Sequence, residues 1–298
     1  MILLWGLLED PTFRSVYDWL RELRANVAFV NHAAVGRTRI GLSSSPKLSY
    51  KLCCERHSYR LDTVSAAYLR PYDHRHYDEF AGLGAPQQSA SHADIVHQLM
   101  HVWAEHADAV IINRPSAEAT NHSKLNQARF LRACGFLVPD SIITNDLSEV
   151  RYFLSRHGSV IYKSMSSVRS IVKELHACML DSLGNIGPAL FQQRIVGDNL
   201  RVHVIGEKVF SCLVRSPSID YRYGPASLET AHLPDEITAR CITLARELGL
   251  VVAGIDLIAT PEGKYYCLEV NPNPAFSFFE LSEKNDIAQA VAQALMLG

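Results

Sequence analysis

The chain has 298 residues, of which 48% are hydrophobic and 20% are charged, and its formal net charge is −2. This composition supplies enough apolar material for a large core, and it excludes a disordered chain and a small disulfide-stapled protein. The near balance of 29 basic and 31 acidic residues also argues against a basic nucleic-acid-binding protein. We therefore expect a globular protein with no nucleic-acid partner.

The N-terminus shows neither a membrane anchor nor a signal peptide. Its apolar run, residues 1–8, is stopped by Glu9, Asp10 and Pro11, far short of the roughly 20 residues that a membrane-spanning helix needs. The seven cysteines form no Cys-x-x-Cys motif, which is typical of a reducing compartment. We expect a cytoplasmic protein with no membrane partner.

The first third of the chain alternates between strand and helix patterns. Apolar runs at 1–8 and 27–30 predict strands, and the apolar spacing over 16–23 predicts a helix between them. Further expected elements are a loop at 41–46, a strand at 63–69, a helix at 95–103 and a strand at 109–113. The strand–helix–strand order is typical of a parallel α/β sheet, and we place this N-terminal domain at 1–115.

Two more domains are expected, at 116–187 and 188–298. The first of them contains a helix over 121–134, a helix over 146–157 and a strand at 159–164. The second begins with a strand pair at 199–215, continues through a loop and a helix, and ends with another strand pair.

The last strand pair consists of two β-rich runs, 250–259 and 265–271. The turn-forming sequence at 261–264 joins them into a predicted hairpin. We expect Thr260 to lie opposite Tyr265, and this closure fixes the pairing along both strands.

In this register Asp256 faces Glu269, and Gly254 faces Asn271. Because side chains alternate along a strand, Asp256, Glu269 and Asn271 then share one face. Two opposed carboxylates repel each other, and burial among apolar residues makes the repulsion worse. A cation relieves both costs, and two carboxylates and an amide are oxygen ligands that suit Mg²⁺. The alternative is a solvated outer face that carries ordinary acidic residues.

The preceding strand pair also carries a charged residue on a patterned face. If Ile205 lies opposite Lys208, Arg201 and His203 share a face with Phe210 and Cys212. An arginine in this position needs an anionic partner.

Together these segments resemble the ATP-grasp superfamily. The sequence Cys267-Leu-Glu-Val-Asn-Pro-Asn-Pro274, with Asp256 upstream, resembles its metal-binding end. Four earlier segments match other parts of the family in order: Asn121-His-Ser-Lys124 and Val160-Ile-Tyr-Lys-Ser164 resemble lysine-bearing segments that contact phosphate, Phe191-Gln-Gln-Arg-Ile195 resembles the hinge that holds adenine, and Asn199-Leu-Arg-Val-His-Val204 resembles the Asp-x-Arg strand. The resemblance covers about 113–280.

Within the superfamily, the chain resembles the RimK-like branch and its microviridin-type peptide ligases. The segment 215–222 and the run Glu269-Val-Asn-Pro-Asn-Pro, followed by aromatic residues and Glu280, carry this resemblance. The sequence departs from the family pattern at Gln193 and Asn199, where the family usually has acidic residues. The phosphate loop at 164–170 contains no glycine, whereas the family loop is usually glycine-rich.

The resemblance implies an α/β (α+β) ATP-grasp fold with an N-terminal pre-ATP-grasp domain, a small central domain and a C-terminal antiparallel-sheet domain. It implies an ATP-dependent ligase that phosphorylates a carboxylate, after which an amine or hydroxyl of a peptide or amino acid attacks the acyl phosphate. Mg²⁺ is the expected metal, with Mn²⁺ as an alternative. A precursor peptide and a second copy of the chain, in a homodimer, are the partners that this resemblance suggests.

The resemblance also assigns roles to individual residues. The metal ligands are Asp256, Glu269 and Asn271. The ATP-binding residues are Lys124, Lys163, Gln192, Gln193, Arg194, Ile195 and Asp198. The catalytic residues are Arg201, Arg215 and Asn273.

Two other functions stay open at this point. One is a kinase on the same fold, which passes phosphate to a small-molecule hydroxyl, and the other is a non-catalytic nucleotide-binding module. The helix that contains His97 and His101 offers two zinc-ligand types at a spacing of four residues, but packed or solvated histidines are the favoured interpretation.

Overall fold

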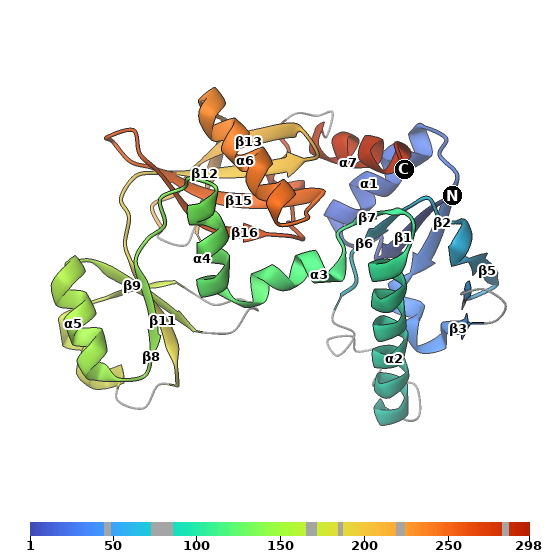
Figure 1. Ribbon diagram of the computed structural model, residues 1–298, viewed down its shortest axis with the longest axis horizontal. Helices are drawn as coiled ribbons and strands as arrows, with labels where there is room; N and C mark the ends of the chain where they lie inside the picture. The colour runs from blue at the N-terminus through green and yellow to red at the C-terminus, as the bar shows by residue number, and fades with distance from the viewer. Residues whose placement is uncertain (45–48, 73–85, 165–171, 184–186, 219–223, 282–285) are drawn as a thin grey trace.

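The computed structural model describes the chain from residue 1 to 298 except 45–48, 73–85, 165–171, 184–186, 219–223 and 282–285. The molecule is elongated, with an N-terminal parallel sheet at one end and a small central sheet at the other (Figure 1). The larger C-terminal sheet lies between them. None of the described helices is long and apolar enough to cross a membrane.

The N-terminal sheet has the strand order β2-β1-β6-β7, and all its pairs are parallel. Its strands are β1 (Ile2–Gly6), β2 (Val27–Asn31), β6 (Ala66–Leu69) and β7 (Val110–Ile112). The helices α1 (Pro11–Glu22) and α7 (Asp286–Met296) cover one face, and α2 (Pro86–His106) covers the other. Burial on both faces explains why β1 reads as an unbroken apolar run. The predicted parallel α/β unit is confirmed.

A small antiparallel sheet adjoins this unit, in a region where the sequence predicts a loop. Its strands are β3 (Arg39–Ser43), β4 (Ser49–Cys54) and β5 (His57–Arg60). The loop prediction is therefore wrong for residues 41–43. Most of β3 is exposed, and its alternation is limited to two apolar residues, Ile40 and Leu42, so its pairing with β4 defines it as a strand.

The central sheet is antiparallel, with the order β10-β9-β11-β8. Its strands are β8 (Ser141–Thr144), β9 (Val160–Ser164), β10 (Lys173–Leu175) and β11 (Ala189–Gln193). The helix α5 (Leu147–His157) packs on it through Val150 and Phe153. Asp146 caps the start of α5, and Gly158 ends it with a φ of 71°, a conformation that glycine adopts without strain.

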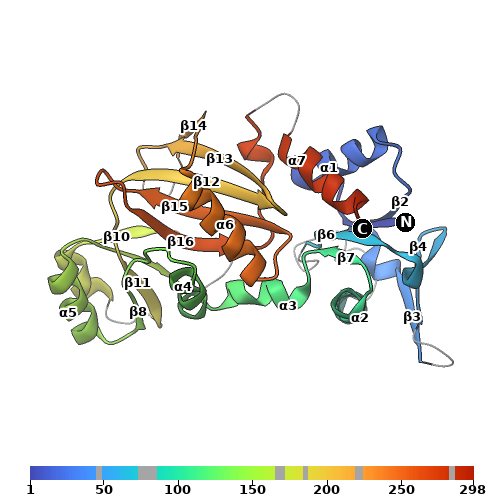
Figure 2. The ribbon, with the colours of Figure 1, turned by 45° about the horizontal axis from the view of Figure 1, so that its top comes forward.

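The C-terminal sheet is antiparallel, with the order β14-β13-β12-β15-β16. Its strands are β12 (Asp198–Ile205), β13 (Lys208–Arg215), β14 (Ser227–Thr230), β15 (Val252–Ala259) and β16 (Tyr265–Asn271). The helix α6 (Asp235–Glu247) lies across one face, against Val202, Val204 and Ile255 (Figure 2). The alternate residues of β12 and β15 face the opposite side, where polar side chains are available for a site.

Two helices pack on sheets that lie far from them in the sequence. Leu131 of α4 (Lys124–Ala133) packs in the core of the C-terminal sheet, although α4 precedes that sheet by more than one element. α7 follows the C-terminal sheet, yet its residues pack with α1 in the core of the N-terminal sheet. A shorter helix, α3 (Pro115–Glu118), connects β7 toward α4. The apolar cores therefore contain residues from both sides of positions 115 and 187, where the sequence predicts domain boundaries.

Candidate active site

The hairpin of β15 and β16 places two carboxylates opposite each other. Asp256 pairs with Glu269 and Gly254 pairs with Asn271, as the sequence predicts. The predicted closure at the turn is wrong, because Ala259, not Thr260, lies opposite Tyr265.

A β-bulge reconciles these two results. The register shifts between Asp256 and Leu257, so Leu268 has no paired residue on β15. Thr260 closes the turn instead, with its N–H donating to the carbonyl oxygen of Lys264 at 2.9 Å. One extra residue on β16 thus compensates the one-residue difference at the turn and restores the carboxylate pair.

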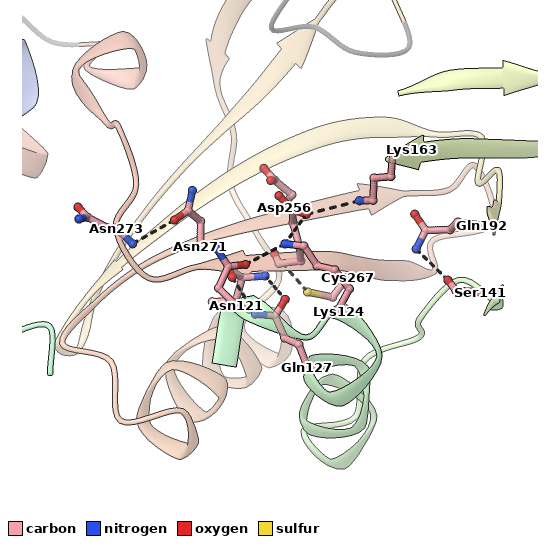
Figure 3. A network of polar contacts seen from close by, with 12 residues as sticks. Asn121, Lys124, Gln127, Ser141, Lys163, Gln192, Asp256, Cys267, Asn271 and Asn273 are labelled. Atoms are coloured by element: carbon pink, nitrogen blue, oxygen red, sulfur yellow. Dashed lines mark hydrogen bonds and ion pairs between the residues drawn. The ribbon is translucent and has the colours of Figure 1, made fainter. Parts of the chain in front are cut away.

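Two lysines from different elements reach Glu269. The Nζ of Lys124, at the start of α4, lies 3.0 Å from Glu269 Oε2, and the Nζ of Lys163, on β9, lies 3.6 Å from the same atom. Lys124 also donates to Asn121 Oδ1 at 2.8 Å. Figure 3 shows both lysine side chains extending toward the strand pair that carries Asp256. The central sheet and the C-terminal sheet therefore meet at this carboxylate.

The position of α4 follows from its own polar residues. Ser123 caps the helix by accepting a hydrogen bond from the N–H of Asn126 at 3.3 Å. One turn after Lys124, the buried amide of Gln127 donates to the carbonyl oxygen of Val270 at 2.8 Å and accepts from its N–H at 2.9 Å. These two bonds satisfy the N–H and carbonyl groups of Val270 at the edge of the sheet, as a neighbouring strand would. They fix the helix, and with it Lys124, beside Glu269.

Arg201 neutralises the second carboxylate. It lies on β12 opposite Asp256, and its Nη1 donates to Asp256 Oδ1 at 2.8 Å. Its side chain is only 7% exposed, and the guanidinium carbon lies 5.3 Å from the centre of the Phe279 ring. The predicted pairing of Ile205 with Lys208 and of Arg201 with Cys212 is confirmed.

His203 supports Arg201 from the same face. Its ring nitrogen Nε2 accepts a hydrogen bond from Arg201 Nε at 3.4 Å, and the residue is 1% exposed. Burial, and then the neighbouring arginine charge, lower the pKa of His203 well below its usual value. The imidazole is therefore neutral at pH 7, as an acceptor for arginine must be.

Gly254 leaves space for the arginine. A Cβ atom at this position would lie 2.3 Å from Arg201 Nη2 and 2.7 Å from the Cβ of Pro274. Sequence reasoning used Gly254 only to set the register and missed this close approach. Its sole signal was a glycine inside an otherwise apolar strand.

Asn271 ends β16 and begins a tight turn. Its Oδ1 accepts a hydrogen bond from the N–H of Asn273 at 3.0 Å. Asn273, a predicted catalytic residue, in turn accepts a hydrogen bond on its side-chain oxygen from Arg70 of the N-terminal unit. Sequence reasoning did not identify Arg70, because no local pattern links it to this turn.

The predicted adenine hinge connects the central and C-terminal sheets. Gln192 is 8% exposed, and its Nε2 donates to Ser141 Oγ at 3.1 Å. The N–H of Gln193 donates to the carbonyl oxygen of Asp140 at 2.8 Å, and Arg194 pairs with Glu174 at 2.7 Å. The half-buried Ile195 follows the end of β11. Residues 165–170 of the predicted phosphate loop and residues 219–222 lie outside the described residues.

Two of the predicted site residues contact each other at the surface. Arg215 Nη1 donates to Asp198 Oδ1 at 2.9 Å, and both side chains are more than half exposed. Arg215 also lies 3.8 Å from Glu229. Because the register of β13 continues regularly, Arg215 lies on the face opposite the one that carries Arg201 and Cys212.

The donor set of the site suits a hard divalent cation. Asp256, Glu269 and Asn271 supply carboxylate and amide oxygens from directly facing strand positions. Among the described residues, no group of three or more His, Cys, Asp and Glu side chains is arranged to hold a metal ion. Oxygen-only donors are typical of Mg²⁺ rather than of zinc.

The histidines of α2 have a different environment. His97 Nε2 lies 2.6 Å from His32 Nε2, and the centre of its ring lies 4.9 Å from that of Trp5. Burial lowers the pKa of His101 on the next turn. These three histidines therefore lie together beside Trp5.

The arrangement of these sheets is shared with solved structures of ATP-grasp proteins. The macrocyclase MdnC from Microcystis aeruginosa, bound with the precursor peptide MdnA, superimposes with a TM-score of 0.85 at 20% identity, over 100% of both chains. The ATP-grasp ligase PsnB, complexed with a minimal precursor variant, Mg and ADP, gives a TM-score of 0.82 at 26% identity, over 99% of this chain and 97% of that one. The fold is therefore the ATP-grasp fold, as predicted.

A comparison with sequence families identifies one branch of the ATP-grasp proteins. Residues 157–295, in the C-terminal half of the chain, match the model of the RimK-like ATP-grasp domain. The predicted resemblance to the RimK-like branch is confirmed.

Curated relatives agree with this result. A probable alpha-L-glutamate ligase of Haemophilus ducreyi is 26% identical over 208 residues, which are 63% of this chain and 66% of the relative. One of Parasynechococcus marenigrum is 30% identical over 137 residues, which are 45% of this chain and 28% of the relative. The chain thus spans less than two thirds of the length of these relatives.

Proposed function

We propose that this protein is an ATP- and Mg²⁺-dependent ligase that joins a carboxylate to an amine or hydroxyl of a peptide or amino acid. The observation that carries the proposal is the facing pair of Asp256 and Glu269, contacted by cationic side chains from three separate elements. Three cations outnumber two carboxylates here, and a divalent metal ion would add to the excess. The site is therefore suited to a polyanion such as a triphosphate.

Each charged group has a place in this reaction. Lys124 and Lys163 would neutralise phosphate oxygens of ATP, while Arg201 would orient the reacting carboxylate and stabilise the charge of the transferring phosphoryl group. The carboxylate oxygen attacks the γ-phosphorus, ADP leaves, and an acyl phosphate forms. The amine or hydroxyl then attacks the acyl carbon, inorganic phosphate leaves with the C–O bond electrons, and the nucleophile loses its proton.

Asp256, Glu269 and Asn271 would hold Mg²⁺, with Mn²⁺ as an alternative, and the bound metal would supply charge neutralisation at the phosphate oxygens. We assign Gln192, Gln193, Arg194 and Ile195 to the adenine side of the site, because they occupy the connection between the two sheets that would enclose a nucleotide. We assign Asp198 to the ATP-binding residues. We assign Arg215 and Asn273, together with Arg201, to the catalytic residues.

The substrate proposal rests on the structural relatives. Two of them are described as complexes with precursor peptides, and PsnB is 26% identical to this chain. We infer that this chain also modifies a precursor peptide. We propose that it is divided into three domains, at 1–115, 116–187 and 188–298. The seven cysteines are all free thiols, which agrees with the proposed cytoplasmic location. We also propose that the protein assembles as a homodimer.

The test is release of ADP and phosphate with ATP and Mg²⁺ against a panel of carboxylates, amines and short peptides, with mass spectrometry of the products. Glu269→Gln should lower turnover at least about 100-fold, because it removes a charged metal ligand. The matched control is Glu262→Gln, at the exposed turn of the same hairpin, which should stay within twofold of wild type. A joined product that has lost water supports the ligase.

Two other outcomes would overturn the proposal. A phosphorylated acceptor without a joined product would identify a kinase. Nucleotide binding without ADP release for every acceptor, including peptides encoded beside this chain, would identify a binding module.

A further inference from the structure

The carboxyl end of the N-terminal parallel sheet faces the turn that follows the proposed metal site. Arg70 comes directly after β6, Asn113 directly after β7, and Asp10 lies between β1 and α1. This edge of an open α/β sheet is commonly a ligand-binding site, because strand ends from separate connections converge there. Here the groups at these strand ends contact the chain itself, at residues 272–274.

Arg70 makes most of these contacts. Its Nη1 donates to the carbonyl oxygens of Asn273 at 3.4 Å and Pro274 at 3.2 Å, and also to the side-chain oxygen of Asn273. Its Nε donates to the carboxylate of Asp10. The Arg70 side chain is only 12% exposed, so these bonds are protected from water. Such charge-assisted bonds are stronger than those between neutral groups.

Asn113 holds the other side of the same turn. It is 4% exposed, and its Nδ2 donates to the carbonyl oxygens of Pro272 and, at 2.7 Å, Val252. Its Oδ1 accepts from the N–H groups of Val251, at 2.8 Å, and Val252, at 3.2 Å. One amide therefore joins the start of β15 to the residue after β16.

The turn needs such external donors because of its composition. Pro272 and Pro274 have no N–H group, so this segment cannot form an ordinary ladder of backbone hydrogen bonds. Its carbonyl oxygens are instead satisfied from the N-terminal unit. The N–H of Asn273 is used by Asn271 Oδ1, which keeps a second lone pair for a cation.

We infer that Arg70 is a positioning residue of the metal site. It fixes Asn273, and Asn273 in turn orients the amide oxygen of Asn271, so Asp10, Arg70, Asn273 and Asn271 form one hydrogen-bonded chain from the N-terminal sheet to the metal ligands. Through this hydrogen-bonded chain the N-terminal unit positions the metal ligands. The inference rests on the proposed function, because it assigns the metal to Asn271.

The test compares Arg70→Met and Arg70→Lys with the control Arg14→Met, which removes an exposed ion pair with Asp18 on α1. The first measurement is Mn²⁺ binding by electron paramagnetic resonance in the presence of a non-hydrolysable ATP analogue. Loss of an outer partner of a metal ligand typically weakens metal binding 10- to 100-fold, and we expect an effect of about this size for Arg70→Met. Arg70→Lys should be intermediate, because lysine keeps the charge but not the fork of donors. The control should stay within about twofold, since the pair it removes is exposed.

The second measurement is amide hydrogen exchange over residues 267–277 without any ligand. Exchange at Asn273 should accelerate in Arg70→Met and stay unchanged in Arg14→Met. Wild-type metal affinity together with wild-type exchange in Arg70→Met would overturn the inference. If wild-type protein binds no Mn²⁺ with the analogue, the proposed function fails, while the exchange result still decides whether Arg70 holds the turn.

Asp10→Asn provides a second variant should Arg70→Met not fold. Asp10 Oδ1 caps α1 by accepting from the N–H of Thr12 at 2.9 Å, and asparagine caps helices equally well. The substitution thus keeps the helix cap and removes only the charge beside Arg70. We expect a severalfold weakening of Mn²⁺ binding and faster exchange at Asn273, and wild-type values for both would contradict the inference.

Discussion

The N-terminal parallel sheet and the C-terminal antiparallel sheet use polar side chains in different ways. In the parallel sheet, Arg70 and Asn113 stand at strand ends and bond to backbone groups of the turn at 272–274 and of the start of β15. In the antiparallel sheet, Arg201 and Glu269 lie within strands and pair with charged side chains, which can exchange those partners for a ligand. The first arrangement holds the chain in place, and the second forms the proposed binding site.

The largest effect on stability is expected when the side-chain amide of Asn113 is removed. Asn113→Leu deletes an amide that serves two donors and two acceptors in the interior, and each unsatisfied group costs about 1–3 kcal/mol. We expect the free energy of unfolding to fall by at least about 3 kcal/mol, measured by urea denaturation. Asn126→Leu, at an exposed position of α4, is the control and should change it by less than about 0.5 kcal/mol. Equal stability of the two variants would contradict the conclusion that Asn113, at a strand end of the parallel sheet, holds the chain in place.

A pH-dependent effect is expected at Glu118, near Arg70. Burial raises the pKa of Glu118 to about 7, although the positive charge of Arg70 opposes the shift. The folded protein therefore binds this proton more tightly than the unfolded chain does. The resulting contribution to stability is complete below pH 4.5 and is lost as the pH rises through 7.

Glu118→Gln should therefore be about 3 kcal/mol more stable than wild type at pH 8 and nearly equal to it at pH 4. Thermal unfolding of both proteins across this range measures the difference. A difference that stays constant with pH would show that folding does not shift the pKa of this carboxyl.

The smallest effect is expected at the exposed pair of Arg215 and Asp198. Exposed ion pairs contribute about 0–1 kcal/mol, so Arg215→Ala should lower the free energy of unfolding by less than about 1 kcal/mol. Turnover of the same variant tests the proposed catalytic role separately. A large loss of turnover at unchanged stability would extend the binding surface of the antiparallel sheet to its opposite face.

The predictions from sequence were most accurate where one local pattern fixes the structure. The pairing of Asp256 with Glu269 was predicted correctly, although the turn was placed one residue away from its true closure. The bulge at Leu268 cancels that error, and a bulge has no reliable signature in an apolar strand. The exposed strand β3 was missed because its alternation contains only two apolar residues and continues into the Ser- and Pro-rich segment that predicted a loop.

The sequence by itself determined the parallel N-terminal sheet, the ATP-grasp resemblance and the pairing of Asp256 with Glu269, because strand periodicity and motif spacing are local properties. Only the tertiary structure revealed Gln127 on the edge of β16, Gly254 beneath Arg201, and Arg70 on the turn at Asn273. Each of these contacts joins residues more than 50 positions apart. Such contacts arise when packed elements must satisfy buried hydrogen-bonding groups or make room for a buried side chain, and no window of neighbouring residues records that requirement.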